Sequence, residues 1–144
     1  MTRDAAEIFA TIDRFVPEDF VAHLSEDVVF RFGNADAAVG RNAVRGAVAG
    51  FFSSIAGIQH HILDVWEVDQ DTTVVRIDVE YRRHDGETVY IPNVDILRWR
   101  GDHVADWQIV IDVAPIYAPF DEVPQAAKTP TTPHTTTVTD PIAV

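Results

Sequence analysis

An aspartate, Asp95, lies in the middle of an otherwise apolar stretch, residues 91–99, that has the composition of a β-strand. The Asp85-Gly86 pair before it, between two β-patterned runs, predicts a hairpin with a two-residue loop. Counting back along that hairpin places Arg76 directly opposite Asp95. The sequence therefore predicts a charged pair on one face of a sheet.

The same count places Asp78 opposite Asn93, so that Arg76 is flanked by two carboxylates, those of Asp78 and Asp95. Charge on the covered face of a sheet is costly unless it is paired or used. Arg76, Asp78 and Asp95 are therefore candidates for polarising or protonating a substrate. A structural cross-strand ion pair is an equally open interpretation.

Length and composition restrict the class of protein. The chain has 144 residues and is 47% apolar, which suits one globular domain with a sizeable core. No run approaches the roughly 20 apolar residues of a membrane span, and the first residues lack the apolar stretch of a signal peptide, so we expect a cytoplasmic protein without a membrane partner. Cysteine is absent, which excludes disulfides and thiolate zinc sites. The net charge of -12 argues against nucleic acid as a partner.

Helical signals precede strand signals along the chain. Apolar residues at helical spacing predict helices over residues 5–16, from Pro17 to Leu24, and from Arg41 to Gly57. A short strand is expected at 28–33, a loop from Asn34 to Gly40, and then long strands at 58–68, 73–83, 88–100 and 104–113. Helices followed by a meander of antiparallel strands indicate the α+β class.

The last part of the chain, residues 121–144, is rich in Thr and Pro and poor in large apolar residues. Such a segment buries too little surface to offset its ordering entropy, so we expect one domain over residues 1–120 and a disordered tail. A rival expectation is that Val138, Ile142 and Val144 dock on a neighbouring subunit.

The order of elements resembles the nuclear-transport-factor-2-like superfamily over about residues 5–120, and within it the SnoaL-like group. The motifs that carry the resemblance are Phe30-x-Phe32-Gly33, Gly40-Arg41, the Asp-Gly hairpin, and Trp107 followed by Asp112 and Pro115. The resemblance implies a cone-shaped, curved antiparallel sheet wrapped around three N-terminal helices, enclosing a deep apolar pocket. We also expect a homodimer that forms through the outer face of the sheet. The superfamily hosts isomerases, cyclases, dehydratases, epoxide hydrolases and noncatalytic binding domains, so the fold alone does not select a reaction.

Comparison with individual groups of the superfamily gives three partial matches. Asp95 matches the aspartic acid with which ketosteroid isomerases bind an oxyanion, but their base position falls at Phe32 and their tyrosine position at Ile8 or Phe9. An Arg across from Asp95 would also favour its ionised form, against that role. Arg76 and Asp78 match the Arg-x-Asp pair of limonene-type epoxide hydrolases.

The third match is to scytalone dehydratase and hexachlorocyclohexane dehydrochlorinase, whose first-helix Asp and first-long-strand His fall at Asp13 and His60. A His oriented by a carboxylate is a suitable general base, because the carboxylate stabilises the imidazolium. A hydrogen-bonded core histidine is the alternative interpretation of His60. His61 would face inward instead if the strand phase shifts by one residue.

Together these observations favour an enzyme that transfers protons on a small hydrophobic substrate, in isomerisation, cyclisation or dehydration. His60 held by Asp13 is the expected base. Asp95 and Asp78, together with Arg76, are expected to polarise or protonate the far end of the substrate. The expected substrate-binding residues are Phe30, Phe32, Asn93, Trp99 and Trp107. No metal or organic cofactor is expected. The alternatives are an epoxide hydrolase using an Asp-Arg-Asp network and a noncatalytic ligand-binding or assembly domain.

Overall fold

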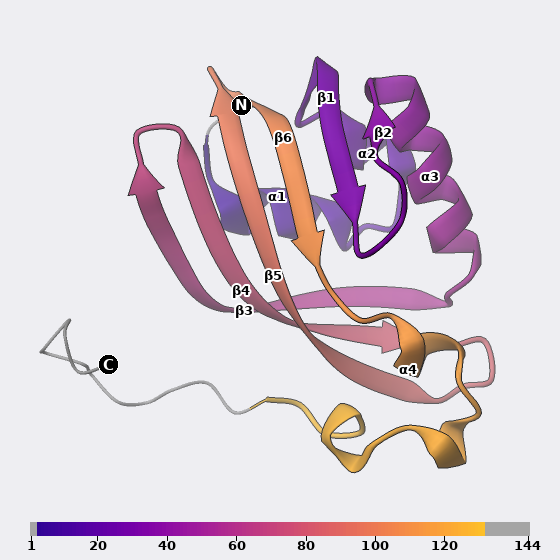
Figure 1. The fold of residues 1–144 in the computed structure, drawn as a ribbon. Coiled ribbons are helices and arrows are strands. Elements are labelled where there is room, and N and C mark those ends of the chain that lie inside the picture. Colours follow the sequence, from indigo (N-terminus) through magenta and orange to yellow (C-terminus); the bar gives the residue numbers. More distant parts are fainter. Residues whose placement is uncertain (1–2, 132–144) are drawn as a thin grey trace, which may run out of the picture.

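The structure, a computed structural model, describes residues 3–131. A six-stranded sheet curves around the helices of the N-terminal half, as Figure 1 shows. The elements are α1 (Ala5–Ile12), α2 (Pro17–Val21), β1 (Leu24–Phe32), β2 (Ala38–Val39), α3 (Arg41–Ser53), β3 (Gly57–Asp69), β4 (Thr72–Arg82), β5 (Thr88–Arg100), β6 (His103–Val110), α4 (Ala114–Tyr117), and the 3₁₀ turns η1 (Phe120–Glu122) and η2 (Gln125–Ala127). The expected α+β class, with a curved sheet wrapped around N-terminal helices, is confirmed.

Helix α1 is shorter than the apolar spacing predicts. Its start is fixed by Asp4, whose side chain accepts hydrogen bonds from the first free backbone N–H groups. It ends at Ile12 rather than at residue 16, because Phe15 adopts a positive φ of 67° and its ring stacks on Phe52 with a centroid distance of 4.7 Å. The early end makes Asp13 the C-cap residue of the helix, which leaves its side chain free to reach the neighbouring strand β3.

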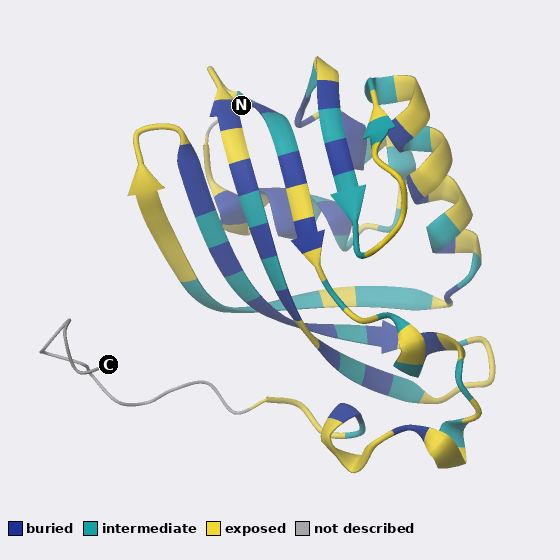
Figure 2. Ribbon diagram, viewed as in Figure 1, coloured by how far each residue is buried: buried dark blue, intermediate teal, exposed yellow. Residues whose placement is uncertain are grey.

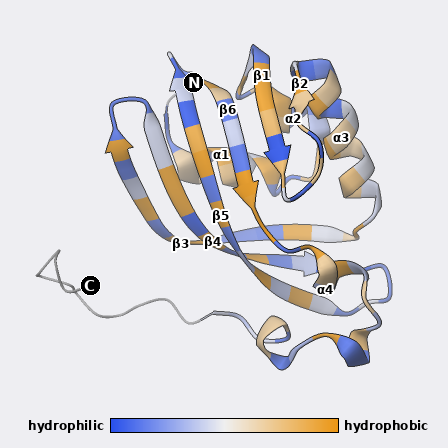
Figure 3. Ribbon diagram, viewed as in Figure 1, coloured by the Kyte–Doolittle hydropathy of each residue, from blue (hydrophilic) through white to orange (hydrophobic). Residues whose placement is uncertain are grey.

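The sheet has the strand order β2-β1-β6-β5-β4-β3. All neighbouring pairs are antiparallel except β1 and β6, which run parallel, with Phe30 opposite Trp107. The two-residue strand β2, where a loop is expected, covers the edge of β1. Burial alternates along β4 and β5, as Figure 2 shows, and hydropathy follows the same alternation over much of their length in Figure 3. The concave face of the sheet thus supplies one side of the core and the helices the other.

The hairpin between β4 and β5 differs from the expected one by a single residue. Arg83 N donates to Glu87 O at 2.8 Å and Gly86 N donates to Arg83 O at 3.1 Å, so the loop contains three residues. Gly86, at φ 86°, takes the left-handed conformation that this wider loop requires. As a result Arg76 lies opposite Val94, and the predicted pairing of Arg76 with Asp95 is wrong.

The same shift changes the partner of Asp78, which lies opposite Pro92 and not opposite Asn93. Since a slip of one residue moves a side chain to the other face of a sheet, Arg76 and Asp78 face outward while Asp95 and Asn93 face the helices.

The segment after β6 is more ordered than its composition suggests. Residues 114–131 lie along the hairpin of β4 and β5, and Val123 and Ala127 are buried there. Arg83 anchors the segment by donating to Pro115 O at 3.0 Å and to Ala118 O at 2.7 Å. Residues 121–131 therefore differ from the expected tail.

The remaining tail positions, including Val138, Ile142 and Val144, lie outside the described residues. Among residues 3–131 no helix has the length and apolar character needed to cross a membrane.

Candidate active site

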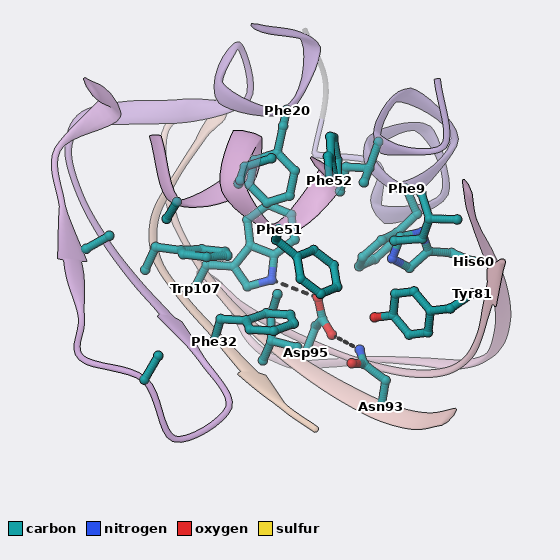
Figure 4. A pocket seen from close by; sticks show the side chains of 18 of the residues that line it. Phe9, Phe20, Phe32, Phe51, Phe52, His60, Tyr81, Asn93, Asp95 and Trp107 are labelled. Atoms are coloured by element: carbon teal, nitrogen blue, oxygen red, sulfur yellow. Dashed lines mark hydrogen bonds between the residues drawn. The ribbon is translucent and has the colours of Figure 1, made fainter. Parts of the chain in front are cut away.

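A cavity lies between the concave face of the sheet and helices α1, α2 and α3. The space inside it that is open to a water-sized molecule measures about 180 Å³, which is room for a small ligand. Its wall is rich in aromatic side chains, and the polar groups that face it lie on the strands (Figure 4), except for Asp36 in the loop between β1 and β2. The aromatic residues are Phe9, Phe20, Phe30, Phe32, Phe51, Phe52, Tyr81 and Trp107.

His60 faces this cavity from β3, and Asp13 holds it in place from the end of α1. The Nδ1 atom of His60 lies 2.5 Å from Oδ1 of Asp13, and the backbone N–H of His60 donates to Oδ2 of Asp13 at 3.0 Å. An ionised carboxylate only accepts hydrogen bonds, so the ring proton of His60 belongs on Nδ1. That tautomer leaves the lone pair of Nε2 available for a proton.

The environment of His60 is apolar on its other side. Its side chain is 9% exposed and packs against the ring of Phe9 with a centroid distance of 4.9 Å. His61 faces outward, where its Nε2 lies 3.0 Å from Glu80 Oε1. The structure thus assigns the inward position to His60.

Asp95 lies on the floor of the same cavity and is almost completely buried. Oδ2 of Asp95 accepts a hydrogen bond from the indole Nε1 of Trp107 at 2.7 Å, and Oδ1 accepts one from the side-chain amide of Asn93. Burial raises the pKa of Asp95 to about 6, although these two donors and the nearby His60 partly offset the effect. A carboxyl group that titrates near neutrality can both give and take a proton at physiological pH.

Tyr81 is a cavity residue that the sequence analysis does not identify. It is buried on β4, and its hydroxyl points toward Asp95 and Asn93 in Figure 4. Burial and the charge of Asp95 raise the pKa of Tyr81 well above its usual range, so the hydroxyl stays protonated and can donate. The inward alternation of β4, on which Ile77, Val79 and Tyr81 share a face, is the sequence signal that identifies it.

Arg76 and Asp78 do not contribute to the cavity. Arg76 donates from Nε to Asp64 Oδ2 at 2.7 Å on the outer face of the sheet. Asp78 is covered on that face by the C-terminal segment, where its Oδ2 accepts the backbone N–H of Thr131 at 2.8 Å. The expected network of Arg76 with Asp78 and Asp95 is therefore absent, because the three-residue loop puts Asp95 on the opposite face.

The predicted lining residues divide in a similar way. Phe30, Phe32, Asn93 and Trp107 line the cavity. Trp99 does not; its Nε1 donates to Thr73 Oγ1 at 2.9 Å, beyond the end of the cavity wall on β5. The prediction that Trp99 binds substrate is thus not supported by its position. Phe30 and Phe32 form part of the wall and leave the cavity open.

No group of three or more His, Cys, Asp or Glu side chains among residues 3–131 is arranged to hold a metal ion. Apart from Asp36 in the loop between β1 and β2, the polar groups that face the cavity come from neighbouring strands: His60 from β3, Tyr81 from β4, Asn93 and Asp95 from β5, and the Trp107 N–H from β6. Such an arrangement can remove a proton at one point of a bound molecule and donate one at another.

Comparison with known proteins agrees with this architecture. Residues 5–107 match the SnoaL-like domain family. No match is found among curated protein sequences. Many solved structures are similar, and the three that follow share 15–18% of their sequence with this chain.

One is a Catenulispora acidiphila protein of ketosteroid isomerase-like fold, in complex with trimethylamine. It has a TM-score of 0.73 and 15% identity, over 86% of this chain and 100% of that one. A second is the epoxide hydrolase/cyclase-like enzyme SalBIII of pyran ring formation in salinomycin, with a TM-score of 0.65 and 15% identity over 76% and 88% of the two chains. A third is a ketosteroid isomerase-like protein from Erwinia carotovora, with a TM-score of 0.60 and 18% identity over 80% and 92%.

Proposed function

Because the chain belongs to the SnoaL-like domain family, we propose that it is an enzyme that transfers protons on a small, largely apolar substrate without a cofactor. The observation that carries this proposal is that a carboxylate-oriented histidine and a buried carboxyl group face one aromatic cavity. The similarity to isomerase-like and cyclase-like proteins is consistent with it. The trimethylamine in the Catenulispora acidiphila protein is in keeping with a small-molecule partner.

His60 is the base in this proposal. Asp13 fixes the tautomer in which Nε2 is unprotonated, and it stabilises the imidazolium that forms when Nε2 takes a proton. Positioned proton transfer of this kind typically contributes about 10²- to 10⁴-fold to a rate. Asp13 itself touches no substrate and acts as a positioning residue.

Asp95 is the group that acts on the substrate oxygen. In its protonated form it donates to the oxygen as negative charge develops there, and the hydroxyl of Tyr81 lies on the same side of the cavity as a second donor. The outward position of Arg76 removes the objection that an arginine would keep Asp95 ionised. Asn93 and Trp107 orient the carboxyl group by their hydrogen bonds.

The reaction step follows from these positions. Nε2 of His60 takes a proton from the carbon next to a carbonyl group, and the electrons of that C–H bond form a C=C bond. The carbonyl oxygen receives the proton of Asp95, which gives an enol and an Asp95 carboxylate. Return of a proton at another carbon completes an isomerisation, attack of the enol carbon on a second carbonyl completes a cyclisation, and loss of a hydroxyl group as water completes a dehydration.

The proposal can be tested without knowing the net reaction, because enolisation in D₂O exchanges the hydrogens next to a carbonyl. Proton NMR would follow loss of these signals in a panel of cyclic and aryl ketones. We expect exchange to be catalysed by the wild-type protein and to fall at least about 10²-fold in His60→Gln. The matched control is His61→Gln, which alters the adjacent, outward-facing histidine and should keep the wild-type rate.

Equal exchange in His60→Gln and the wild type would exclude His60 as the base. Absence of catalysed exchange across ketones that bind in the cavity would favour the noncatalytic ligand-binding domain. An epoxide hydrolase that uses Arg76, Asp78 and Asp95 together is disfavoured, because Asp95 lies on the opposite face of the sheet from the other two.

A further inference from the structure

The cavity has an unbalanced set of charges. Its titratable lining residues are Asp36, His60, Tyr81 and Asp95, and neither Lys nor Arg is among the residues that line it. Asp36 lies in the exposed loop between β1 and β2 at the mouth. His60 is the one group there that can become a cation, and it already has a carboxylate partner in Asp13.

The two sides of the cavity also differ in polarity. The helices contribute aliphatic and aromatic side chains alone, from α1, α2 and α3. The sheet presents the polar atoms of His60, Tyr81, Asn93 and Asp95, as Figure 4 shows. A molecule that satisfies both sides is apolar over most of its surface and carries its hydrogen-bonding atoms on one edge.

We infer that the cavity selects uncharged, flat ring compounds that carry an oxygen on one edge, and that it excludes the carboxylate counterparts of these compounds. This inference rests on the proposed function, because it names the substrate class of the same site. The oxygen-bearing edge faces the sheet, where Asp95 and Tyr81 can donate, and the rings lie against the aromatic side chains of the helices.

The exclusion of carboxylates follows from electrostatics. A bound carboxylate loses its hydration on entering the apolar cavity and meets no Lys or Arg there, and His60 is already paired with Asp13. Its charge also lies near that of Asp95, and like charges repel more strongly where the effective dielectric is low. A neutral ketone has neither cost, since Asp95 can take up a proton when the ketone binds.

The test compares two ligands of nearly equal size and shape, 2-acetylnaphthalene and 2-naphthoate, which have the same number of non-hydrogen atoms. Isothermal titration calorimetry on the full chain at neutral pH would give both dissociation constants. We expect the ketone to bind at least about tenfold more tightly than the carboxylate, a difference of about 1.4 kcal/mol. Naphthoate binding as tightly as the ketone would overturn the inference, and so would failure of the folded protein to bind either compound.

Two substitutions test whether the charge of Asp95, and not the apolar character of the cavity alone, causes the preference for the ketone. Asp95→Asn should strengthen naphthoate binding and so reduce the ratio between the dissociation constants of naphthoate and the ketone. Asp64→Asn, which removes a carboxylate from the outer face, should leave that ratio unchanged. If Asp95→Asn does not fold, Asp36→Asn at the exposed mouth should narrow the preference in the same direction. An unchanged preference in the folded cavity variant would contradict the electrostatic cause.

Binding selectivity does not require turnover, so the two proposals fail separately. A protein that prefers the ketone but catalyses no exchange in D₂O contradicts the proposed function alone. A protein that catalyses exchange but binds naphthoate equally well contradicts the substrate class alone.

Discussion

Asp13 accepts hydrogen bonds from both the ring Nδ1 and the backbone N–H of His60, and it does so from the position where helix α1 ends. One carboxylate therefore fixes the orientation of the imidazole and also joins the helix to strand β3. The side chain of Asp13 is 22% exposed and that of His60 is 9% exposed. The carboxylate of Asp13 therefore lies nearer to solvent than the imidazole of His60, which forms part of the cavity wall.

Replacement of Asp13 by Asn should reduce catalysed exchange by about 10²-fold or more, because an amide can donate a hydrogen bond as well as accept one and so no longer fixes the tautomer of His60. The loss is expected in kcat, with a small change in KM, since Asp13 does not line the aromatic cavity. Initial rates of deuterium exchange at several ketone concentrations would measure both constants. Asp64→Asn is the matched control, and a loss confined to KM would contradict the role of Asp13.

The rate should depend on pH through Asp95. Its pKa of about 6 means that the protonated, donating form is lost as pH rises through that value. We expect kcat/KM for exchange to fall about tenfold per pH unit above pH 6, and we expect this dependence to be absent in Asp95→Asn. A wild-type rate that is constant between about pH 6 and pH 8 would show that protonated Asp95 is not needed.

Stability should depend on pH through the same group. The folded-state pKa of Asp95 is raised from 3.8 to about 6, so the folded protein binds the proton more tightly than the unfolded chain does. The contribution of Asp95 to the free energy of unfolding is therefore most favourable below pH 3.8 and is lost as pH rises through about 6. The difference of about two pKa units corresponds to roughly 3 kcal/mol.

Asp95→Asn should remove this dependence and unfold at higher denaturant concentration than the wild type at about pH 8, because the amide of Asn93 can turn to accept from the new Asn. Urea unfolding of both proteins at several pH values would show it. The comparison must be made between the two proteins, since burial lowers the pKa of His23 and so destabilises both as pH falls. Parallel stability curves for the two proteins would contradict the raised pKa of Asp95.

The expected homodimer can be tested on the outer face of the sheet. Trp66 on β3 and Val110 on β6 are apolar and about half exposed there, at 48% and 52%. If this face joins two copies, Val110→Glu should shift the protein to the monomer, because it places a charge in an apolar contact. Sedimentation velocity would report the change, and Val16→Glu, at an exposed position between α1 and α2 and away from the sheet, is the control. A wild-type protein that sediments as a monomer would refute the dimer.

The fold was predictable because its signals are long and regular. The helical spacing in α3 and the alternation in β4 and β5 leave little choice of element. The positions of Asp13 and His60 were also predictable, through the resemblance to the superfamily. The face of the sheet on which each charged side chain lies was not predictable, because it depends on whether the hairpin loop contains two residues or three.

That one-residue difference accounts for the wrong assignment of Arg76 and Asp78. A Gly in a hairpin loop supplies the left-handed conformation in either loop type, and the sequence around Gly86 does not separate the two. The C-terminal segment was missed for another reason: its composition is that of a solvated chain, but Arg83 and the buried side chains of Val123 and Ala127 give it tertiary contacts that no local pattern records.

The division of the cavity into a polar sheet side and an apolar helix side has a consequence for how such a protein can diversify. The residues proposed for proton transfer lie on strands whose hydrogen-bonded ladder fixes them relative to one another. The residues that set cavity shape on the other side, such as Ala47, Phe51 and Phe52, lie on α3 and enter no hydrogen bond with the proton-transfer groups. Substitutions on α3 can thus change which molecules fit while the chemistry is retained, and a library confined to that helix is the natural starting point for directed evolution.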